Sequence, residues 1–142
     1  MIDPLVRPAG PSDWAQIEFL EAEARTSLGE QRGGPRWLAD HPARTWAAAG
    51  SLVWVAHIDD VIVGYLVATV DGALARIVEV YVTPAARELG FGDELLAAAV
   101  AAARTAGATT LDGETLPGDR GTKNLYERAG IKARLITVST PL

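Results

Sequence analysis

Apolar residues early in the chain recur at every third or fourth position, which is the period of a helix with one buried face. Ser12 or Asp13 can cap this helix, because either side-chain oxygen accepts a hydrogen bond from an exposed N–H group of the first turn. A glycine-rich segment over 29–35 should end it, before a second short helix over 37–46. A short strand over 5–7 comes first. The apolar positions of the first helix are Ile17, Leu20, Ala24 and Leu28.

From residue 51 the pattern becomes that of extended chain, rich in β-branched and aromatic residues. The turn sequences Asp59-Asp60 and Asp71-Gly72 separate its first three segments, which predicts an antiparallel meander. A long amphipathic helix follows over 92–106, and Gly107 is placed to end it. The predicted strands are 52–58, 61–70, 74–82, 108–116 and 131–139, and the last predicted helix is 121–129.

This order of elements predicts a mixed α/β fold in which helices flank a central, predominantly antiparallel sheet. The late strand-helix-strand unit should cross over right-handed, so its two strands should pair in parallel. A chain of 142 residues and 15.0 kDa is long enough to bury one ordinary core. We therefore expect a single domain over 1–142.

Composition excludes several classes of site and partner. The net charge is −5 without a Lys/Arg cluster, which argues against nucleic acid and anionic membranes as partners. The absence of cysteine excludes disulfides, thiolate metal sites and a cysteine nucleophile. Two scattered histidines give no metal constellation. No apolar run is long enough for a membrane span or a signal peptide, so we expect a cytoplasmic protein.

The segment after residue 79 carries the clearest candidate chemistry. A strand runs into a loop in which Gly90 and Gly92 lie at the start of the long helix, so unshielded N–H groups converge there. These groups and the helix dipole favour an anion, and a diphosphate suits the span. Arg87 adds a positive charge. The dinucleotide fingerprint does not fit, because Leu95 occupies its third glycine position, and 118–123 lacks the Gly-Lys-Ser/Thr ending of a P-loop.

Two motifs together resemble the GNAT superfamily of N-acetyltransferases. Arg87-x-x-Gly90-x-Gly92 matches the Arg/Gln-x-x-Gly-x-Gly/Ala motif that binds acetyl-CoA in that family. The segment DRGTKNLYERAGI over 119–131 is similar to its later Asn-x-x-Ala-x-x-x-Tyr-Glu-x-x-Gly-Phe motif, with Tyr126 in the tyrosine position and Asp119 in place of the more usual Asn.

The resemblance implies acyl transfer from acetyl-CoA to a primary amine by direct attack in a ternary complex, without a metal. It makes Tyr126 the general acid that protonates the departing thiolate, and it places the pantetheine arm on the backbone of Val80, Tyr81 and Val82. The loop after this strand would hold the diphosphate, and Asp119 would lie at the cofactor. The residues expected in the diphosphate loop are Arg87, Glu88, Leu89, Gly90, Phe91, Gly92 and Asp93.

Direct attack requires a neutral amine, whereas an alkylammonium with a pKa near 10 is mostly protonated at neutral pH. Glu79 is the candidate base. Strand alternation places Ile77, Glu79 and Tyr81 on one face and Val78, Val80 and Val82 on the other. A chain of water molecules can remove the proton of the ammonium in place of Glu79. Glu79 can alternatively be an ion-pair partner. Asp112 and Glu114 are alternative bases.

Several features depart from the family pattern. The carboxylates of Glu88, Asp93 and Glu94 would repel a diphosphate, which keeps open the alternative of a CoA-sensing or protein-binding module with little turnover. Only one strand is expected after Ile131, where the family commonly has a pair. A second subunit could cover the resulting sheet edge, which predicts a homodimer. The acceptor amine stays open, and the acidic balance favours a cationic small molecule.

Overall fold

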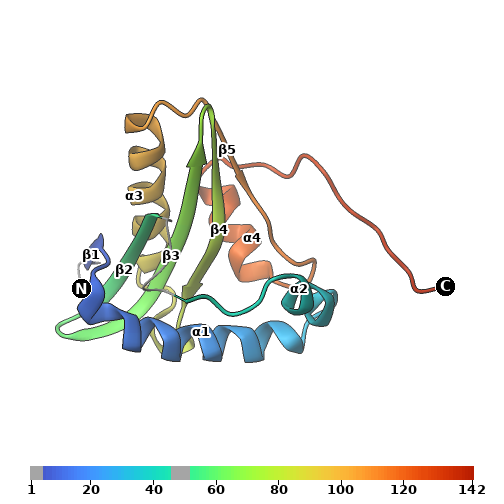
Figure 1. Ribbon diagram of the computed structural model, residues 1–142, viewed down its shortest axis with the longest axis horizontal. Helices are drawn as coiled ribbons and strands as arrows, with labels where there is room; N and C mark the ends of the chain where they lie inside the picture. The colour runs from blue at the N-terminus through green and yellow to red at the C-terminus, as the bar shows by residue number, and fades with distance from the viewer. Residues whose placement is uncertain (1–4, 46–51) are drawn as a thin grey trace.

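The computed structural model describes residues 5–45 and 52–142, and its centre is a five-stranded sheet with strand order β1-β2-β3-β4-β5 (Figure 1). Neighbouring strands are antiparallel except β4 and β5, which are parallel. The predicted mixed, mostly antiparallel α/β fold is therefore confirmed. The strands are β1 (Leu5–Pro8), β2 (Leu52–Ile58), β3 (Val61–Asp71), β4 (Leu74–Val82) and β5 (Thr110–Gly113).

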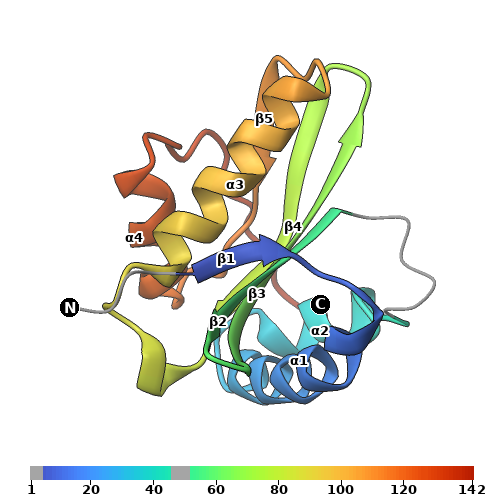
Figure 2. The same ribbon diagram turned by 90° about the vertical axis from the view of Figure 1, so that its left-hand side faces the viewer.

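Helices cover both faces of the sheet (Figure 2). One face carries α1 (Trp14–Gly29), with α2 (Gly34–Asp40) beside it, and the other carries α3 (Phe91–Thr105) and α4 (Arg120–Arg128). Two short 3-10 turns, η1 (Pro11–Asp13) and η3 (Pro84–Ala86), precede α1 and α3. Each described helix is too short or too polar to cross a bilayer.

The sheet separates two apolar clusters, as strand alternation requires. Leu66 and Ile77 pack with Phe91 and Leu95 on the side of α3. Val55, Tyr65 and Val67 pack with Ile17 and Leu20 on the side of α1. Ile17 and Leu20 are positions that the helical period predicted, and Leu95 lies within the helix predicted over 92–106, whereas Phe91 lies just before it.

The second predicted helix is shorter than the sequence pattern indicated. It ends at Asp40 rather than at 46, and Trp46 lies outside the described residues. Pro42 gives the physical reason, because a proline disfavours helical backbone in the residue before it, and His41 is extended with φ −129°. At the other end, a Cβ on Gly34 would lie 1.7 Å from the Leu28 carbonyl oxygen, so the tight connection requires glycine.

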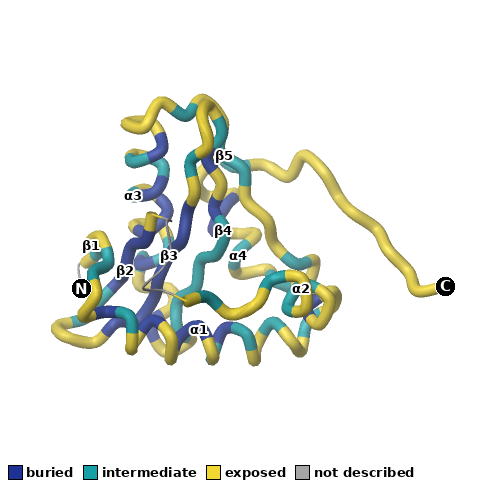
Figure 3. Tube along the Cα trace, viewed as in Figure 1, coloured by how far each residue is buried: buried dark blue, intermediate teal, exposed yellow. Residues whose placement is uncertain are grey.

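The predicted strand over 131–139 is wrong, and the strand predicted over 108–116 is confined to Thr110–Gly113. Residues 132–142 have no secondary structure and are exposed, and they extend away from the body of the molecule (Figures 1 and 3). The sequence favours extended backbone here, but strand propensity creates no sheet unless another strand supplies the hydrogen bonds.

Asp13 does not cap α1 with its side chain, contrary to the expectation for Ser12 or Asp13. Its carboxylate accepts two hydrogen bonds from the Arg7 guanidinium, at 2.7 and 2.8 Å, and one from the Gly10 N–H group at 2.9 Å. The hydrogen bonds from Arg7 hold the pKa of the buried Asp13 carboxyl below its usual value. This ion pair ties β1 to the start of α1.

Asp13→Asn should lower the free energy of unfolding by about 1–3 kcal/mol at neutral pH, because it removes a charged acceptor. A carboxyl whose pKa is depressed by folding stabilises the protein above its unfolded pKa, near 3.9, and loses that contribution as the pH falls through the folded value. Urea unfolding of the wild type and of Asp13→Asn, between pH 7 and strongly acidic conditions, measures how the difference between their free energies of unfolding changes with pH. A wild-type advantage that did not shrink on acidification would contradict the ion-pair explanation.

Candidate active site

A β-bulge in β4 determines which side chains reach the site. Glu79 lies opposite Val67 on β3, but Ile77 lies opposite the next residue, so Val78 is extra. Ile77 therefore packs toward α3, whereas Val78 and Tyr81 pack toward α1. The expectation that Ile77 shares a face with Glu79 and Tyr81, and Val78 with Val80 and Val82, is wrong for this reason. Glu79 and Tyr81 do share a face.

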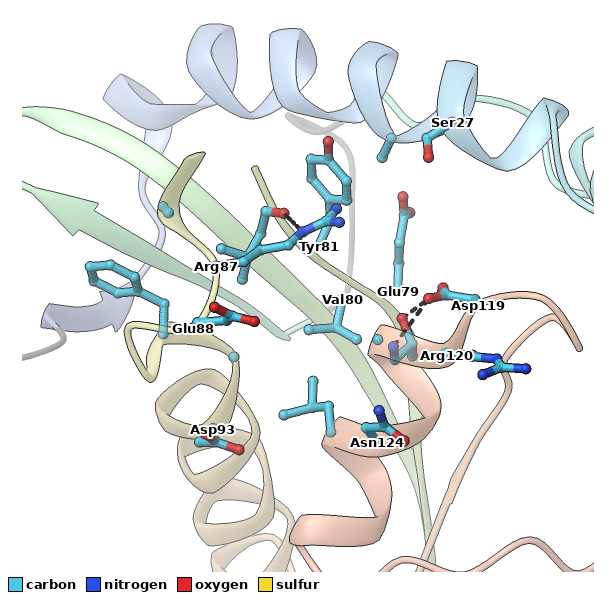
Figure 4. A pocket seen from close by; sticks show the side chains of 18 of the residues that line it. Ser27, Glu79, Val80, Tyr81, Arg87, Glu88, Asp93, Asp119, Arg120 and Asn124 are labelled. Carbon is cyan, nitrogen blue, oxygen red and sulfur yellow. Dashed lines mark hydrogen bonds between the residues drawn. The ribbon is translucent and has the colours of Figure 1, made fainter. Parts of the chain in front are cut away.

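The sheet opens where the bulge begins. The pairing of β4 with β5 covers only Leu74 to Ile77, so no described strand pairs with that edge of β4 from Val78 to Val82. The edge adjoins a cavity of about 710 Å³, a size typical of ligand sites. Walls from α1, β4, the loop before α3 and the start of α4 enclose it (Figure 4). Backbone groups of β4 can therefore meet a bound ligand.

The N-terminus of α3 opens onto this cavity. Gly90 has a left-handed backbone with φ 89°, as has Glu88 with φ 65°. The first helical hydrogen bond runs from the Glu94 N–H group to the Gly90 carbonyl at 3.1 Å, so the N–H groups of residues 90–93 precede the helical ladder. Leu89 alone of the predicted loop does not line the cavity. The loop residues that do are Arg87, Glu88, Gly90, Phe91, Gly92 and Asp93.

Arg87 and Asp93, two of the charged side chains near this helix start, have partners in the fold. Arg87 donates from Nε to the Val82 carbonyl at 2.9 Å, and its guanidinium lies 5.6 Å from the centre of the Tyr81 ring. Asp93, one of the carboxylates expected to repel a diphosphate, accepts a hydrogen bond from Arg128 of α4 at 3.0 Å. Arg128 also lines the cavity, so the tertiary structure offsets the negative charge of Asp93.

Asp119 lines the cavity but directs its carboxylate toward its own helix (Figure 4). It accepts hydrogen bonds from the Thr122 N–H group at 3.1 Å and the Thr122 hydroxyl at 2.7 Å. This is an N-cap of α4, which the sequence signalled by placing an aspartate just before the helix. A contact between Asp119 and the cofactor stays a prediction.

Glu79 is held between a hydroxyl and a guanidinium. The Tyr65 hydroxyl donates to Glu79 Oε1 at 2.5 Å, and Arg44 Nε lies 3.5 Å from Glu79 Oε2. Burial and the Glu79 charge raise the pKa of Tyr65, so its hydroxyl remains a neutral donor. Neither partner was predicted from the sequence. Arg44 is far from β4 in sequence, and only the folded chain brings it beside Glu79. Glu79 therefore forms the ion pair that the sequence allowed and also lines the cavity, and its role as the base stays a prediction.

Tyr126 is buried and is not among the residues that line the cavity, although its helix neighbours Asn124 and Leu125 are. The Tyr126 ring lies against Gly113 of β5, where a Cβ would come within 2.9 Å of the hydroxyl oxygen. Burial, and then the charges of Asp119 and Glu114, raise the pKa of Tyr126 to about 12. Tyr126 is therefore protonated throughout the neutral range, as a proton donor must be.

The contribution of α1 to the site was not foreseen from the sequence. Glu23 accepts hydrogen bonds from the Tyr81 hydroxyl at 2.5 Å and the Thr83 hydroxyl at 2.8 Å, which fastens α1 to the end of β4. Ser27 of the same helix and Gln31, which follows the end of the helix, continue the cavity wall. The helical period shows which positions face the sheet, but it does not show that the sheet opens beneath them.

The alternative bases do not reach the cavity. Asp112 lies 3.5 Å from Arg134, and Glu114 is exposed. Within residues 5–45 and 52–142, His, Asp and Glu residues form no group of three that could hold a metal ion.

Comparison with known proteins relates this arrangement to a family. No curated protein sequence matches the chain significantly. Among solved structures, aminoglycoside N-acetyltransferase AAC(6')-Iy in complex with CoA superposes with a TM-score of 0.71 at 15% identity, covering 97% of this chain and 100% of that one. A transcriptional regulator from Bacillus halodurans gives 0.73 at 21% identity, covering 99% and 100%. An aminoglycoside acetyltransferase from an uncultured soil metagenomic sample gives 0.67 at 18%, covering 99% of each.

These identities show a common fold. The sequence profile of the acetyltransferase (GNAT) family matches residues 13–131, from the start of α1 through both sequence motifs. With that match spanning most of its length, the chain belongs to the GNAT family of acetyltransferases.

Proposed function

We propose that the protein is an N-acetyltransferase that moves the acetyl group of acetyl-CoA to a primary amine. The observation that carries the proposal is the cavity between the open edge of β4 and the N-terminus of α3. One end of this cavity offers helix-terminal N–H groups to an anion, and the other offers strand backbone to an amide-containing chain. A CoA molecule carries both features, and a structural neighbour was solved with CoA.

In this arrangement the diphosphate of CoA lies on the loop over 87–93, and the pantetheine arm runs along the edge of β4 at Val80 to Val82. Pairing with Arg128 offsets the charge of Asp93, one of the carboxylates that would oppose this placement, whereas Glu88 also lines the cavity. The acetyl group then lies near Glu79, between β4 and α1. The same route leads the thioester sulfur toward α4, which carries Tyr126.

The reaction needs a neutral amine, a polarised carbonyl and a proton for the departing sulfur. Glu79, directly or through a water molecule, takes a proton from the acceptor ammonium, and the amine nitrogen then attacks the thioester carbon. A backbone N–H group near Val82 polarises the carbonyl oxygen. The attacking nitrogen then carries one surplus proton, which it loses to solvent water as the tetrahedral intermediate collapses. As the carbon–sulfur bond breaks, Tyr126 gives its proton to the thiolate and regains one from solvent, to which Glu79 releases the proton that it took. No covalent enzyme intermediate forms.

A small cationic amine is the acceptor class that the site favours. Glu79 lines the cavity, and the chain carries a net charge of −5. Negative charge attracts an ammonium group and raises its local concentration. Two of the structural neighbours are aminoglycoside acetyltransferases. Aminoglycosides are small molecules that carry several amino groups.

Release of free thiol from acetyl-CoA, measured against a panel of amines, tests the proposal. The panel should contain aminoglycosides, linear polyamines, amino acids and a lysine peptide. We expect amine-dependent thiol release with a preference for the small polycations. Tight CoA binding without turnover on any amine would instead favour the CoA-sensing module.

Glu79→Gln should lower kcat by about 10- to 100-fold with little change in CoA affinity, at the lower end of general base catalysis because water can still accept the proton. The matched control is Asp112→Asn, which removes a carboxylate of the neighbouring strand outside the cavity and should leave kcat unchanged. Steady-state kinetics together with CoA calorimetry measure both variants. Equal kcat values for Glu79→Gln and the wild type would exclude Glu79 as the base.

A further inference from the structure

The carboxylate of Glu79 is held by two residues that lie outside the cavity. Glu79 lines the cavity, whereas Tyr65 and Arg44 do not. The Tyr65 hydroxyl donates to Glu79 Oε1 at 2.5 Å, and Arg44 Nε lies 3.5 Å from Glu79 Oε2. Only 10% of the Glu79 side chain is exposed. Each carboxylate oxygen therefore has a partner, and neither partner takes up the space in which an acceptor would bind.

The position of Arg44 is itself fixed by α1. Arg44 belongs to the connection between α2 and β2, whose described part runs back beside α1 (Figure 1). Glu21, a buried residue of α1, accepts a hydrogen bond from the Arg44 backbone N–H group at 3.3 Å. Arg25, one turn further along α1, donates to the His41 carbonyl oxygen at 2.6 Å. These two hydrogen bonds hold the backbone that carries the Arg44 guanidinium.

The fixed orientation of Glu79 matters for the role of a base. A general base must keep its accepting oxygen within hydrogen-bond reach of the nitrogen from which it takes a proton. A free glutamate side chain samples several rotamers, and ordering it costs conformational entropy. Because Arg44 and Tyr65 contact both oxygens, Glu79 is ordered before the acceptor binds. Arginine suits this place, since its guanidinium stays charged throughout the neutral range.

We propose that Arg44 is a positioning residue for acyl transfer, whose guanidinium holds the Glu79 carboxylate in the orientation from which it takes the proton of the acceptor ammonium. This inference rests on the proposed function, in which Glu79 is the base. Arg44 lies outside the cavity and acts through Glu79. If Arg44 only supported the fold of its connection, its loss would lower stability, and its effect would not depend on Glu79.

Steady-state kinetics of Arg44→Met, with the amine of the panel that the wild type acetylates fastest, tests the assignment. Methionine keeps an unbranched apolar stem and removes the charge. We expect kcat to fall about 10-fold, because a displacement of about 1 Å costs up to about 100-fold in rate. CoA affinity, measured by calorimetry, should stay unchanged, since the diphosphate loop is not altered.

Two further variants separate charge from bulk. Arg44→Lys restores a positive charge one bond beyond the position of Nε, so it should recover most of the lost rate. Arg36→Met removes an exposed guanidinium of the neighbouring helix α2 and is the matched control, which should keep the wild-type kcat. Equal losses of kcat in Arg44→Lys and Arg44→Met overturn the proposal.

A double-mutant cycle shows whether Arg44 acts through Glu79. In the Glu79→Gln background, Arg44→Met should cause less than about a twofold further loss of kcat, because the group that it positions is already gone. A further loss of about 10-fold overturns the proposal. An unchanged kcat in Arg44→Met beside an impaired Glu79→Gln overturns this inference alone. An unimpaired Glu79→Gln, or a wild type without turnover, overturns the proposed function and this inference together.

Discussion

Gly90→Val should weaken CoA binding at least about a hundredfold. Gly90 begins α3 with φ 89°, a backbone region in which a β-branched residue is a genuine outlier. Valine would force the turn out of the conformation that aligns the N–H groups of residues 90–93 with the cavity. The competent conformation then becomes a minor population, and the apparent affinity falls by the same factor.

Gly90→Ala should give an intermediate result. A single Cβ in the left-handed region costs about 1–2 kcal/mol, which corresponds to a loss of affinity of about 5- to 30-fold. Isothermal titration of CoA into the wild type and both variants measures the series. A graded loss in the order glycine, alanine, valine is the expected result.

Gly107 supplies a matched control for both substitutions. It lies beyond the other end of α3 with φ 90°, and no atom lies within 4 Å of the position of its missing Cβ. Alanine or valine there imposes the same backbone strain but no change at the cavity. CoA affinity should therefore be unchanged while thermal stability falls. Wild-type affinity in Gly90→Val would show that the diphosphate is not bound by this turn.

Tyr126→Phe should lower kcat by about 10²- to 10³-fold, which is the usual contribution of a positioned acid. The substitution keeps the ring against Gly113 and removes only the hydroxyl. The described residues provide no hydrogen-bond partner for that hydroxyl, so its loss should leave the melting temperature nearly unchanged. CoA affinity should also be preserved.

The pH dependence gives this prediction a second readout. Tyrosine donates a proton only below its pKa, and burial and neighbouring carboxylates raise the pKa of Tyr126 to about 12. The wild-type kcat should therefore show no alkaline decline from Tyr126 up to about pH 10. Single-turnover rates across this range, for wild type and Tyr126→Phe, measure it. A kcat for Tyr126→Phe within twofold of wild type would exclude Tyr126 as the acid.

The local pattern of apolar, polar and turn residues was sufficient to predict most of the fold. The antiparallel meander over β2, β3 and β4, the helix α3 and the parallel return to β5 follow from side-chain period, turn residues and connection rules. The loop of Gly90 and Gly92 was identified for the same reason, since the glycines and the helix start are neighbours in sequence. Such features depend on residues a few positions apart.

Errors arose where a partner distant in sequence decides the outcome. Alternation along β4 predicted the wrong neighbours for Glu79, because a bulge at Val78 becomes visible only against the register with β3. The cap of α1 failed for a different reason: Ser12 or Asp13 was expected there, but Asp13 pairs with Arg7, six residues earlier, across the turn between β1 and α1. In each case local chemistry allows two partners, and the folded chain selects one.

The sequence by itself determined the class of fold, the glycine-containing start of α3 and the family to which the chain belongs, because these depend on local periodicity and on short motifs. Only the tertiary structure decided that β4 separates from β5 above the bulge, that Arg128 pairs with Asp93, and that the segment after Ile131 lies outside its own sheet. Hydrogen bonds and ion pairs between elements decide these features, and such pairings exist only once the elements have packed together.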